Sequence, residues 1–108
     1  SPLLSHIYEL GLITAKAVPQ TECFDAGVLF ARTEGILPAP EPTHALAEAM
    51  REARRCAETG EEKVIVTALC GHGLLDLPAY DAYLSGRMVD EDVTPERLAE
   101  GLATLPSV

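Results

Sequence analysis

The sequence predicts an α/β fold, made mostly of helices with about two strands, one of them a buried parallel strand. Two observations carry this prediction. Amphipathic stretches with helical spacing recur along the chain, and residues 64–69 form a continuous apolar run of strand length. Continuous rather than alternating apolarity is typical of a strand that is buried on both faces of a parallel sheet. A chain of 108 residues corresponds to one domain or to part of one.

The first two elements are predicted from their boundary residues. Pro2 suits the first turn of a helix, with Ser1 as its N-cap. Gly11 is well placed to end this helix. Residues 13–18 then alternate in polarity and predict a short strand, which Pro19 closes.

A second helix is predicted from Thr21, as its N-cap, to Glu34, with Gly35 as the stop. Its apolar residues spread around the whole circumference, so they cannot all face one small core. These residues are Cys23, Phe24, Ala26, Val28, Leu29, Phe30 and Ala31. A helix that is apolar on all sides is typical of the interior of a large protein.

A third, amphipathic helix is predicted to begin at about Thr43 and to end at Gly60. The segment before it is expected to be a loop that three prolines stiffen, namely Pro38, Pro40 and Pro42. The predicted buried stripe of the helix consists of Leu46, Ala49, Met50, Ala53 and Ala57. The residues expected to face water are Glu48, Arg51, Glu52, Arg55 and Glu58.

The rest of the chain is predicted to hold the buried strand, a glycine-rich turn and two short helices. Asp76 is placed to cap the first of these helices and Thr94 to cap the second. In the second one, Leu98 and Leu102 are expected to point inward, and the acidic residues 90–92 are expected to form a solvated linker. Because two strands make a poor sheet, we expect neighbouring structure from outside this chain.

Composition excludes several classes of function. The net charge of −9 argues against binding to nucleic acid or to an anionic membrane surface, because both need a basic protein surface. No apolar run approaches the roughly 20 residues of a membrane-spanning helix, and the first ten residues lack the basic start of a signal peptide. Three cysteines at long spacings are typical of a protein from a reducing cytoplasm. No cysteine or histidine pair has the spacing of a zinc site.

The segment Cys70-Gly71-His72-Gly73 follows the predicted buried strand, at the end where open parallel sheets bind ligands. The two glycines would let the backbone approach a ligand closely, with Cys70 and His72 as the nearest functional side chains. The alternatives are a buried cysteine that acts as a small hydrophobe and a histidine that only forms a turn. Glu34 is a second candidate, because the helix dipole disfavours an anion in the last turn. Its alternative is a solvated helix end.

Three stretches of the sequence carry a resemblance to a known family. They are TECFDAGVLFARTEGILPAPEPTHAL, VIVTALCGHGLLDLPAYDAYLSG and ERLAEGLATLPSV, and with their surroundings they cover nearly the whole chain. They resemble tryptophan synthase β subunits, most closely the second, long-chain class. The resemblance implies that residues 1–108 are a single carboxyl-terminal segment of a fold-type II domain that binds pyridoxal phosphate (PLP). The complete enzyme would be a lyase that makes L-tryptophan from L-serine and indole.

The resemblance also implies which residues contact the cofactor. Glu34 matches the family glutamate that lies near the cofactor ring. Cys70 matches a position, usually serine, whose side chain meets the pyridine nitrogen, and a thiol can also donate weakly there. Gly71 and Gly73, on either side of His72, match the glycines of the turn beneath the ring.

The same resemblance implies that part of the PLP site is missing from this chain. Enzymes of this kind bind PLP through a lysine and hold its phosphate in a glycine-rich cup. Lys16 and Lys63 both stand outside the family's lysine context, and no run of glycine and serine could cradle a phosphate. We therefore expect the chain alone to be inactive and to bind PLP weakly or not at all. The implied partners are the amino-terminal portion of the same enzyme or a second copy of this chain, and a tryptophan synthase α subunit.

Two further functions stay open on the residues alone. The chain could be a stand-alone, non-catalytic assembly module that pairs with a copy of itself or with a separate amino-terminal chain. It could also be a small cysteine hydrolase that uses Cys70 and His72. Two residues along one turn rarely bring a thiol and an imidazole within hydrogen-bond distance, which counts against the hydrolase.

Overall fold

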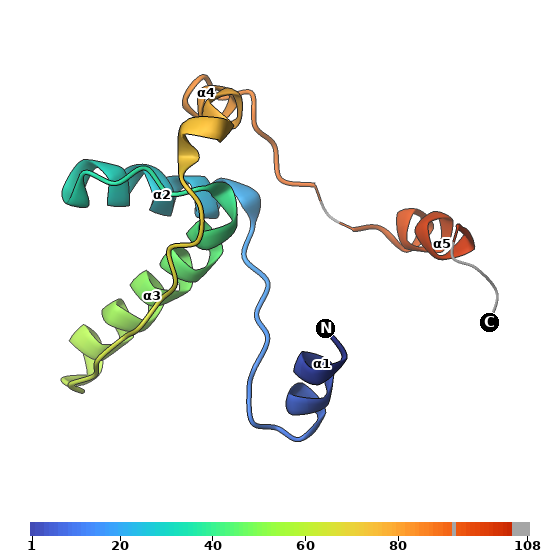
Figure 1. Ribbon diagram of the computed structural model, residues 1–108, viewed down its shortest axis with the longest axis horizontal. Helices are drawn as coiled ribbons and strands as arrows, with labels where there is room; N and C mark the ends of the chain where they lie inside the picture. Colours follow the sequence, from blue (N-terminus) through green and yellow to red (C-terminus); the bar gives the residue numbers. More distant parts are fainter. Residues whose placement is uncertain (92, 105–108) are drawn as a thin grey trace.

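The computed structural model describes residues 1–91 and 93–104, and these residues are mostly helical. The elements are α1 (Pro2–Glu9), α2 (Gln20–Glu34), α3 (Pro40–Thr59), the 3₁₀ helix η1 (Gly73–Asp76), α4 (Leu77–Leu84) and α5 (Pro95–Ala103). Helices α2, α3 and α4 form the centre, and α1 and α5 lie at the ends of two drawn-out arms (Figure 1). The centre is therefore the part of the chain that can position a site.

The main core lies where α2 packs against α3. Ala26 of α2 is buried together with Leu46 and Ala47 of α3. The partly buried side chains around them are Val18, Phe30 and Met50. Alanines at the crossing allow the two helix backbones to approach closely, but they also make the core small.

A second, aromatic cluster attaches α4 to α2. The ring of Phe24 meets the ring of Tyr80 edge to face, with centroids 4.9 Å apart and planes at 70°. The ring of Tyr83 stacks on the ring of Phe24, with centroids 5.8 Å apart and planes at 25°. The hydroxyl of Tyr83 also donates to Asp25 at 3.2 Å. These contacts fix α4 on the helix that carries the main core.

Most helix ends lie where the local sequence predicts them. Gly35 and Gly60 follow α2 and α3 with φ of 71° and 73°, the left-handed conformation that glycine adopts without strain. Asp76 is the N-cap residue of α4. At α5 the Thr94 hydroxyl oxygen accepts a hydrogen bond from the backbone N–H of Arg97 at 3.3 Å. The four predicted boundary positions are confirmed, although the side chain of Asp76 makes no capping hydrogen bond.

The predicted cap of α2 is wrong. The helix begins one residue before Thr21, with Pro19 as the N-cap residue, so Thr21 lies in the first turn. The capping carboxylate belongs to Asp90, which accepts hydrogen bonds from the backbone N–H of Thr21 at 2.8 Å and from its hydroxyl. Asp90 and Glu91 are exposed, as the predicted solvated linker requires, but Asp90 also holds its segment to the start of α2. Asp92, in the same predicted linker, lies outside the described residues, and so do residues 105–108 at the end of the third resembling stretch.

The start of α3 is also earlier than predicted. The helix begins at Pro40, so Pro40 and Pro42 belong to its first turn rather than to a loop. A proline is tolerated there because the first backbone N–H groups of a helix have no partner within the helix. The prolines therefore start α3 instead of delaying it.

Burial along α3 and α5 differs from the predicted stripes. In α3 the side chains of Thr43 and Ala47 are buried, whereas Ala53 and Ala57 are exposed. Ala53 and Ala57 lie beyond Met50, the last residue of α3 that packs against the core shared with α2. In α5 both Leu98 and Leu102 are more than half exposed instead of pointing inward.

The two predicted strands are absent from the described residues. Residues 13–18 and 64–69 run there as drawn-out segments (Figure 1), and the only pairing of strand type is an isolated antiparallel bridge between Pro38 and His72. Val64 is 92% exposed and Val66 is 89% exposed, so the segment predicted as a buried parallel strand is not buried. A strand needs a hydrogen-bonded neighbour, and the described part of the chain offers none to either segment.

Candidate functional site

The glycine turn of residues 70–73 is held against the loop of residues 37–39. The backbone N–H of Gly73 donates to the carbonyl of Leu37 at 2.9 Å, and the N–H of Ala39 donates to the carbonyl of Gly71 at 3.4 Å. Between them His72 forms the bridge with Pro38. The turn is therefore fixed by backbone contacts on both sides of His72.

Both glycines of the turn are required by this close packing. A Cβ atom at Gly73 would lie 2.4 Å from the carbonyl oxygen of Pro38, far inside van der Waals contact. A Cβ atom at Gly71 would lie 3.0 Å from the Cβ of Ala39, and Gly71 has a φ of +93° that other residues rarely adopt. The 37–39 loop therefore packs on the side of each glycine where a Cβ atom would stand.

Tyr80 of α4 supports the turn from the side of the core. Its hydroxyl donates a hydrogen bond to the Pro38 carbonyl at 2.7 Å, and its ring packs beside Gly73. Burial raises the pKa of Tyr80, so its hydroxyl stays protonated as a donor. A Cβ atom at Gly27 of α2 would lie 2.8 Å from both the Tyr80 hydroxyl and Thr43 Cγ2. Gly27, Thr43 and Tyr80 therefore join α2, α3 and α4 beneath the turn.

These supporting residues were missed from the sequence. The available signal was Gly27, since a glycine inside an apolar helix often marks a close packing contact. Tyr80 carried no such signal, because its partner Pro38 lies 42 residues away in the chain.

Cys70 and His72 are both exposed, but they do not form a nucleophile and base pair. The Nδ1 atom of His72 accepts a hydrogen bond from the backbone N–H of Leu74 at 3.2 Å and so caps η1. Among the described residues no hydrogen bond joins the Cys70 thiol to His72. The cysteine hydrolase hypothesis therefore gains no support from this geometry.

Glu34 is not brought to the glycine turn by any contact of the described residues. It is the last residue of α2 and is exposed. Gly27, which packs under the turn, lies seven residues earlier, so Glu34 stands about 10 Å further along the helix axis. Residues 70–73, which are consecutive in the chain, form one turn, and Glu34 lies at a separate helix end.

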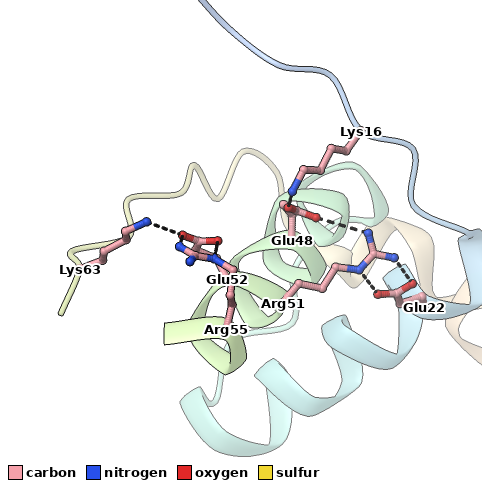
Figure 2. A network of polar contacts seen from close by, with 7 residues as sticks. All are labelled: Lys16, Glu22, Glu48, Arg51, Glu52, Arg55 and Lys63. Atoms are coloured by element: carbon pink, nitrogen blue, oxygen red, sulfur yellow. Dashed lines mark hydrogen bonds and ion pairs between the residues drawn. The ribbon is translucent and has the colours of Figure 1, made fainter. Parts of the chain in front are cut away.

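A network of ion pairs holds both drawn-out segments to α3 (Figure 2). Lys16 pairs with Glu48, and Arg51 links Glu48 at 3.3 Å to Glu22 of α2 at 2.5 Å. Further along the helix, Lys63 pairs with Glu52 at 3.0 Å.

The carboxylates of this network have lowered pKa values. Hydrogen bonds from Arg55 and Lys63 lower the pKa of Glu52 to about 2, and a hydrogen bond from Lys16 lowers the pKa of Glu48. Conversely, Glu52 and Glu61 raise the pKa of Lys63. Both lysines of the chain are therefore engaged with carboxylates on or beside α3.

The described residues contain neither a metal site nor a membrane-spanning helix. No group of three or more His, Cys, Asp or Glu side chains in residues 1–91 and 93–104 could hold a metal ion. The three cysteines all lie within these ranges and are free thiols. None of the helices found there combines the length and the apolarity that crossing a bilayer requires.

Comparison with known proteins finds curated proteins that are similar in sequence to this chain. No family model matches it. It is 58% identical over 90 residues to tryptophan synthase beta chain 2 of Aquifex aeolicus, which is 83% of this chain and 21% of that protein. It is 52% identical over 88 residues to tryptophan synthase beta chain 2 of Methanothermobacter thermautotrophicus, covering 82% of this chain and 20% of the relative.

A third relative extends over almost the whole chain. The tryptophan synthase beta chain of Pyrococcus horikoshii is 44% identical over 106 residues, which is 98% of this chain and 23% of the relative. The chain therefore spans about a fifth of the length of the curated relatives that it matches. Identity at this level over most of its residues shows that the chain belongs to the tryptophan synthase beta chain family, as a carboxyl-terminal part of it.

Proposed function

We propose that residues 1–108 form one carboxyl-terminal segment of a PLP-dependent, tryptophan synthase β-like lyase of fold-type II. In the complete enzyme the hydroxyl group of L-serine would be replaced by indole to give L-tryptophan. The observation that carries the proposal is the identity of 44–58% to tryptophan synthase beta chains over most of the chain. The activity belongs to the complete enzyme, of which this chain spans about a fifth.

The glycine turn is compatible with the pyridine end of a PLP site. Cys70 offers an exposed thiol directly before a turn whose backbone is fixed on the 37–39 loop. A group that meets a cofactor needs such rigid support to hold its geometry. In this proposal Cys70 meets the ring nitrogen and residues 71–73 lie beneath the ring. Glu34 is the remaining contact, and only the family resemblance supports it.

The chemistry of Cys70 agrees with β-replacement. When bound, PLP supplies an electron sink for bonds at the α and β carbons of an amino acid. Cys70 would offer a weak, neutral hydrogen bond to the ring nitrogen, where a carboxylate would favour a full positive charge. The sink is then milder, which suits elimination and replacement at the β carbon. The role of Cys70 is thus to position the ring without charging it.

The lysine and the phosphate cup of the site would come from the amino-terminal portion of the complete enzyme. Lys16 is paired with Glu48, and Lys63 is paired with Glu52 and Glu61 at 3.0 and 3.2 Å. The raised pKa of Lys63 keeps its amine protonated and therefore poorly nucleophilic. We propose that this chain alone is inactive, and that a tryptophan synthase α subunit is a further partner of the complete enzyme.

The test joins this chain to the amino-terminal four-fifths of the Aquifex aeolicus relative. Both the chimera and the chain alone are purified, mixed with PLP, and assayed for tryptophan from L-serine and indole. The chimera should show the visible absorbance of bound PLP and should form tryptophan, and the chain alone should do neither. Tryptophan formation by the chain alone, or a folded chimera that neither binds PLP nor forms tryptophan, would contradict the proposal.

The second candidate function is a non-catalytic assembly module. The apolar residues left exposed on and after α1 favour it, because a monomer rarely exposes so many together. They are Leu3, Leu4, Tyr8, Leu10, Leu12 and Ile13. Sedimentation over a wide concentration range separates the two functions. Self-association of the chain alone supports the module, and a strict monomer contradicts it.

A further inference from the structure

Tyr80 of α4 is held in one position by the core helix α2. Tyr80 is 4% exposed, and its ring meets the ring of Phe24 edge to face, with centroids 4.9 Å apart. A Cβ atom at Gly27 would lie 2.8 Å from the Tyr80 hydroxyl oxygen, so this glycine lets the hydroxyl come close to α2. A side chain packed this closely keeps one arrangement. The place of the Tyr80 hydroxyl is therefore fixed by the helix that carries the main core.

The carbonyl of Pro38 depends on this hydroxyl. The Tyr80 hydroxyl donates to it at 2.7 Å, and no other hydrogen bond to this oxygen occurs among the described residues. Pro38 is fully buried, so water has little access to the carbonyl. A buried acceptor that loses its donor is unfavourable. Removal of the hydroxyl should therefore shift the loop of residues 37–39.

A shift of this loop would reach Cys70 through two backbone hydrogen bonds. The N–H of Gly73 donates to the carbonyl of Leu37 at 2.9 Å, and the N–H of Ala39 donates to the carbonyl of Gly71 at 3.4 Å. The loop and the glycine turn are thus joined on both sides of the bridge between them. Because Gly71 follows Cys70 directly, the position of the Cys70 thiol follows that of the loop.

A thiol donor is sensitive to such a shift. The S–H group is a weak donor, and hydrogen bonds weaken steeply as their geometry departs from the ideal. A group that meets a cofactor must be held within about 0.5 Å of its productive place by the residues behind it. Cys70 itself takes part in none of the side-chain hydrogen bonds of the described residues. Its position therefore depends on the backbone of the turn.

We propose that Tyr80 is a positioning residue of the cofactor site. Its hydroxyl holds the Pro38 carbonyl, the loop of residues 37–39 holds the glycine turn, and the turn holds the Cys70 thiol where it meets the pyridine nitrogen of PLP. The inference rests on the proposed function, because the contact of Cys70 with that nitrogen belongs to it. The effect of Tyr80 on PLP binding should accordingly pass through Cys70.

A double-mutant cycle tests this role in the chimera with the amino-terminal portion of the Aquifex aeolicus relative. PLP affinity is measured by equilibrium dialysis for the parent, Tyr80→Phe, Cys70→Ala and the double variant, and circular dichroism checks that each is folded. Tyr80→Phe should weaken PLP binding by about 3- to 10-fold, the range expected for one lost hydrogen bond. In the Cys70→Ala background the same substitution should change the affinity by less than about 2-fold.

The absorbance of bound PLP supplies a readout that a merely structural role would not move. The pH at which the spectrum changes depends on the hydrogen bond to the ring nitrogen. In Tyr80→Phe this profile should therefore shift toward that of Cys70→Ala. Tyr83→Phe removes an exposed hydroxyl bond from the same helix and should keep the profile and the PLP affinity of the parent. Lower stability of Tyr80→Phe with an unchanged profile and affinity overturns the positioning role.

Gly27→Ala gives a second route to the same shift. Its methyl group would lie 2.8 Å from the Tyr80 hydroxyl, so it pushes the hydroxyl away from Pro38 without removing it. Alanine also favours the helix, which offsets part of the strain. PLP binding should again weaken, and again only when Cys70 is present. This comparison decides the matter where Tyr80→Phe does not fold. PLP binding that neither substitution weakens, or that both weaken equally with and without Cys70, overturns the proposal.

The outcome is separable from that of the proposed function. A parent chimera that binds PLP but makes no tryptophan rejects the lyase and leaves the cycle valid, because the cycle measures PLP binding alone. A parent chimera that makes tryptophan, with an affinity and a spectrum that Tyr80→Phe leaves unchanged, retains the lyase and rejects the role of Tyr80. A folded parent chimera that binds no PLP rejects both.

Discussion

The hydroxyl of Tyr80 donates a hydrogen bond of 2.7 Å to the carbonyl oxygen of Pro38. Tyr80 belongs to α4, whereas Pro38 lies in the loop between α2 and α3. The same carbonyl sits against Gly73, so this one contact brings α4, the loop and the glycine turn together. The stability of the turn should therefore depend on a residue outside it.

Tyr80→Phe should lower the free energy of unfolding by about 1–2 kcal/mol, because the buried Pro38 carbonyl would lose its partner. Urea unfolding followed by circular dichroism measures this change. Tyr83→Phe is the matched control, since its hydroxyl bond to Asp25 at 3.2 Å is exposed. That control should change stability by about 0.5 kcal/mol or less. Equal effects of the two substitutions would contradict the role given to Tyr80.

Gly73→Ala should destabilise the chain by about 1–3 kcal/mol, because the new methyl group would displace the Pro38 carbonyl. Gly101→Ala is the control, since a Cβ atom at Gly101 of α5 meets nothing within 4 Å. Alanine there should favour the helix by about 0.5–1 kcal/mol. The same urea titration compares both variants. A neutral Gly73→Ala would show that the turn is not packed as closely as described.

Thiol reactivity should separate the cysteines. Cys70 is exposed, whereas Cys23 is 1% exposed and burial raises its pKa. A thiolate is the reactive form, so a disulfide reagent should modify Cys70 at once and Cys23 only as the chain unfolds. Cys70→Ser should remove the fastest phase of the reaction and leave the slower phase of the half-buried Cys56. A fast phase that persists in that variant would place an accessible thiol elsewhere.

Stability should also depend on pH through Glu52. Hydrogen bonds from Arg55 and Lys63 lower its pKa from an ordinary value of 4.5 to about 2 in the folded chain. A lowered carboxylate pKa stabilises the fold fully above the unfolded value, and this contribution is lost as pH falls towards the folded value. We therefore expect a loss between about pH 5 and pH 2, measured by urea unfolding across that range.

Glu52→Gln should flatten this part of the pH profile. Glu58→Gln, at an exposed position on the same helix, is the control and should leave the profile as it is in the parent chain. Superimposable profiles for the parent and Glu52→Gln would contradict the assignment to Glu52.

Local features of the fold could be predicted from the sequence, and features with distant partners could not. Gly35 and Gly60 end their helices through their own conformational freedom, which the sequence displays directly. From the sequence alone Thr21 has the features of a cap, because Asp90, the true capping group, lies 69 residues away. The prediction of two strands is wrong for a related reason. A strand needs a hydrogen-bonded neighbour, and the polarity pattern and length of residues 13–18 and 64–69 do not show whether the chain provides one.

The candidate site shows the same division. The segment of residues 70–73 stood out from its cysteine, histidine and two glycines, and it does form a defined turn. Glycine is needed at residues 71 and 73 because the 37–39 loop packs on them. No local sequence pattern predicts this contact. Glu34 was inferred from its helix end and from the family resemblance, and it remains a prediction about the complete enzyme.

The hydrogen bond between Thr21 and Asp90 closes residues 21–90 into a ring without a covalent link. Bringing the two ends of this segment together costs chain entropy. Once they are joined, the side chains between them are held close to one another, so further contacts within the ring cost less entropy. The glycine turn, its loop and Tyr80 all lie inside this ring, whereas α1 and α5 hang outside it as tails. A protease that trims both tails should therefore leave a fragment of about residues 20–91 that still folds around the turn.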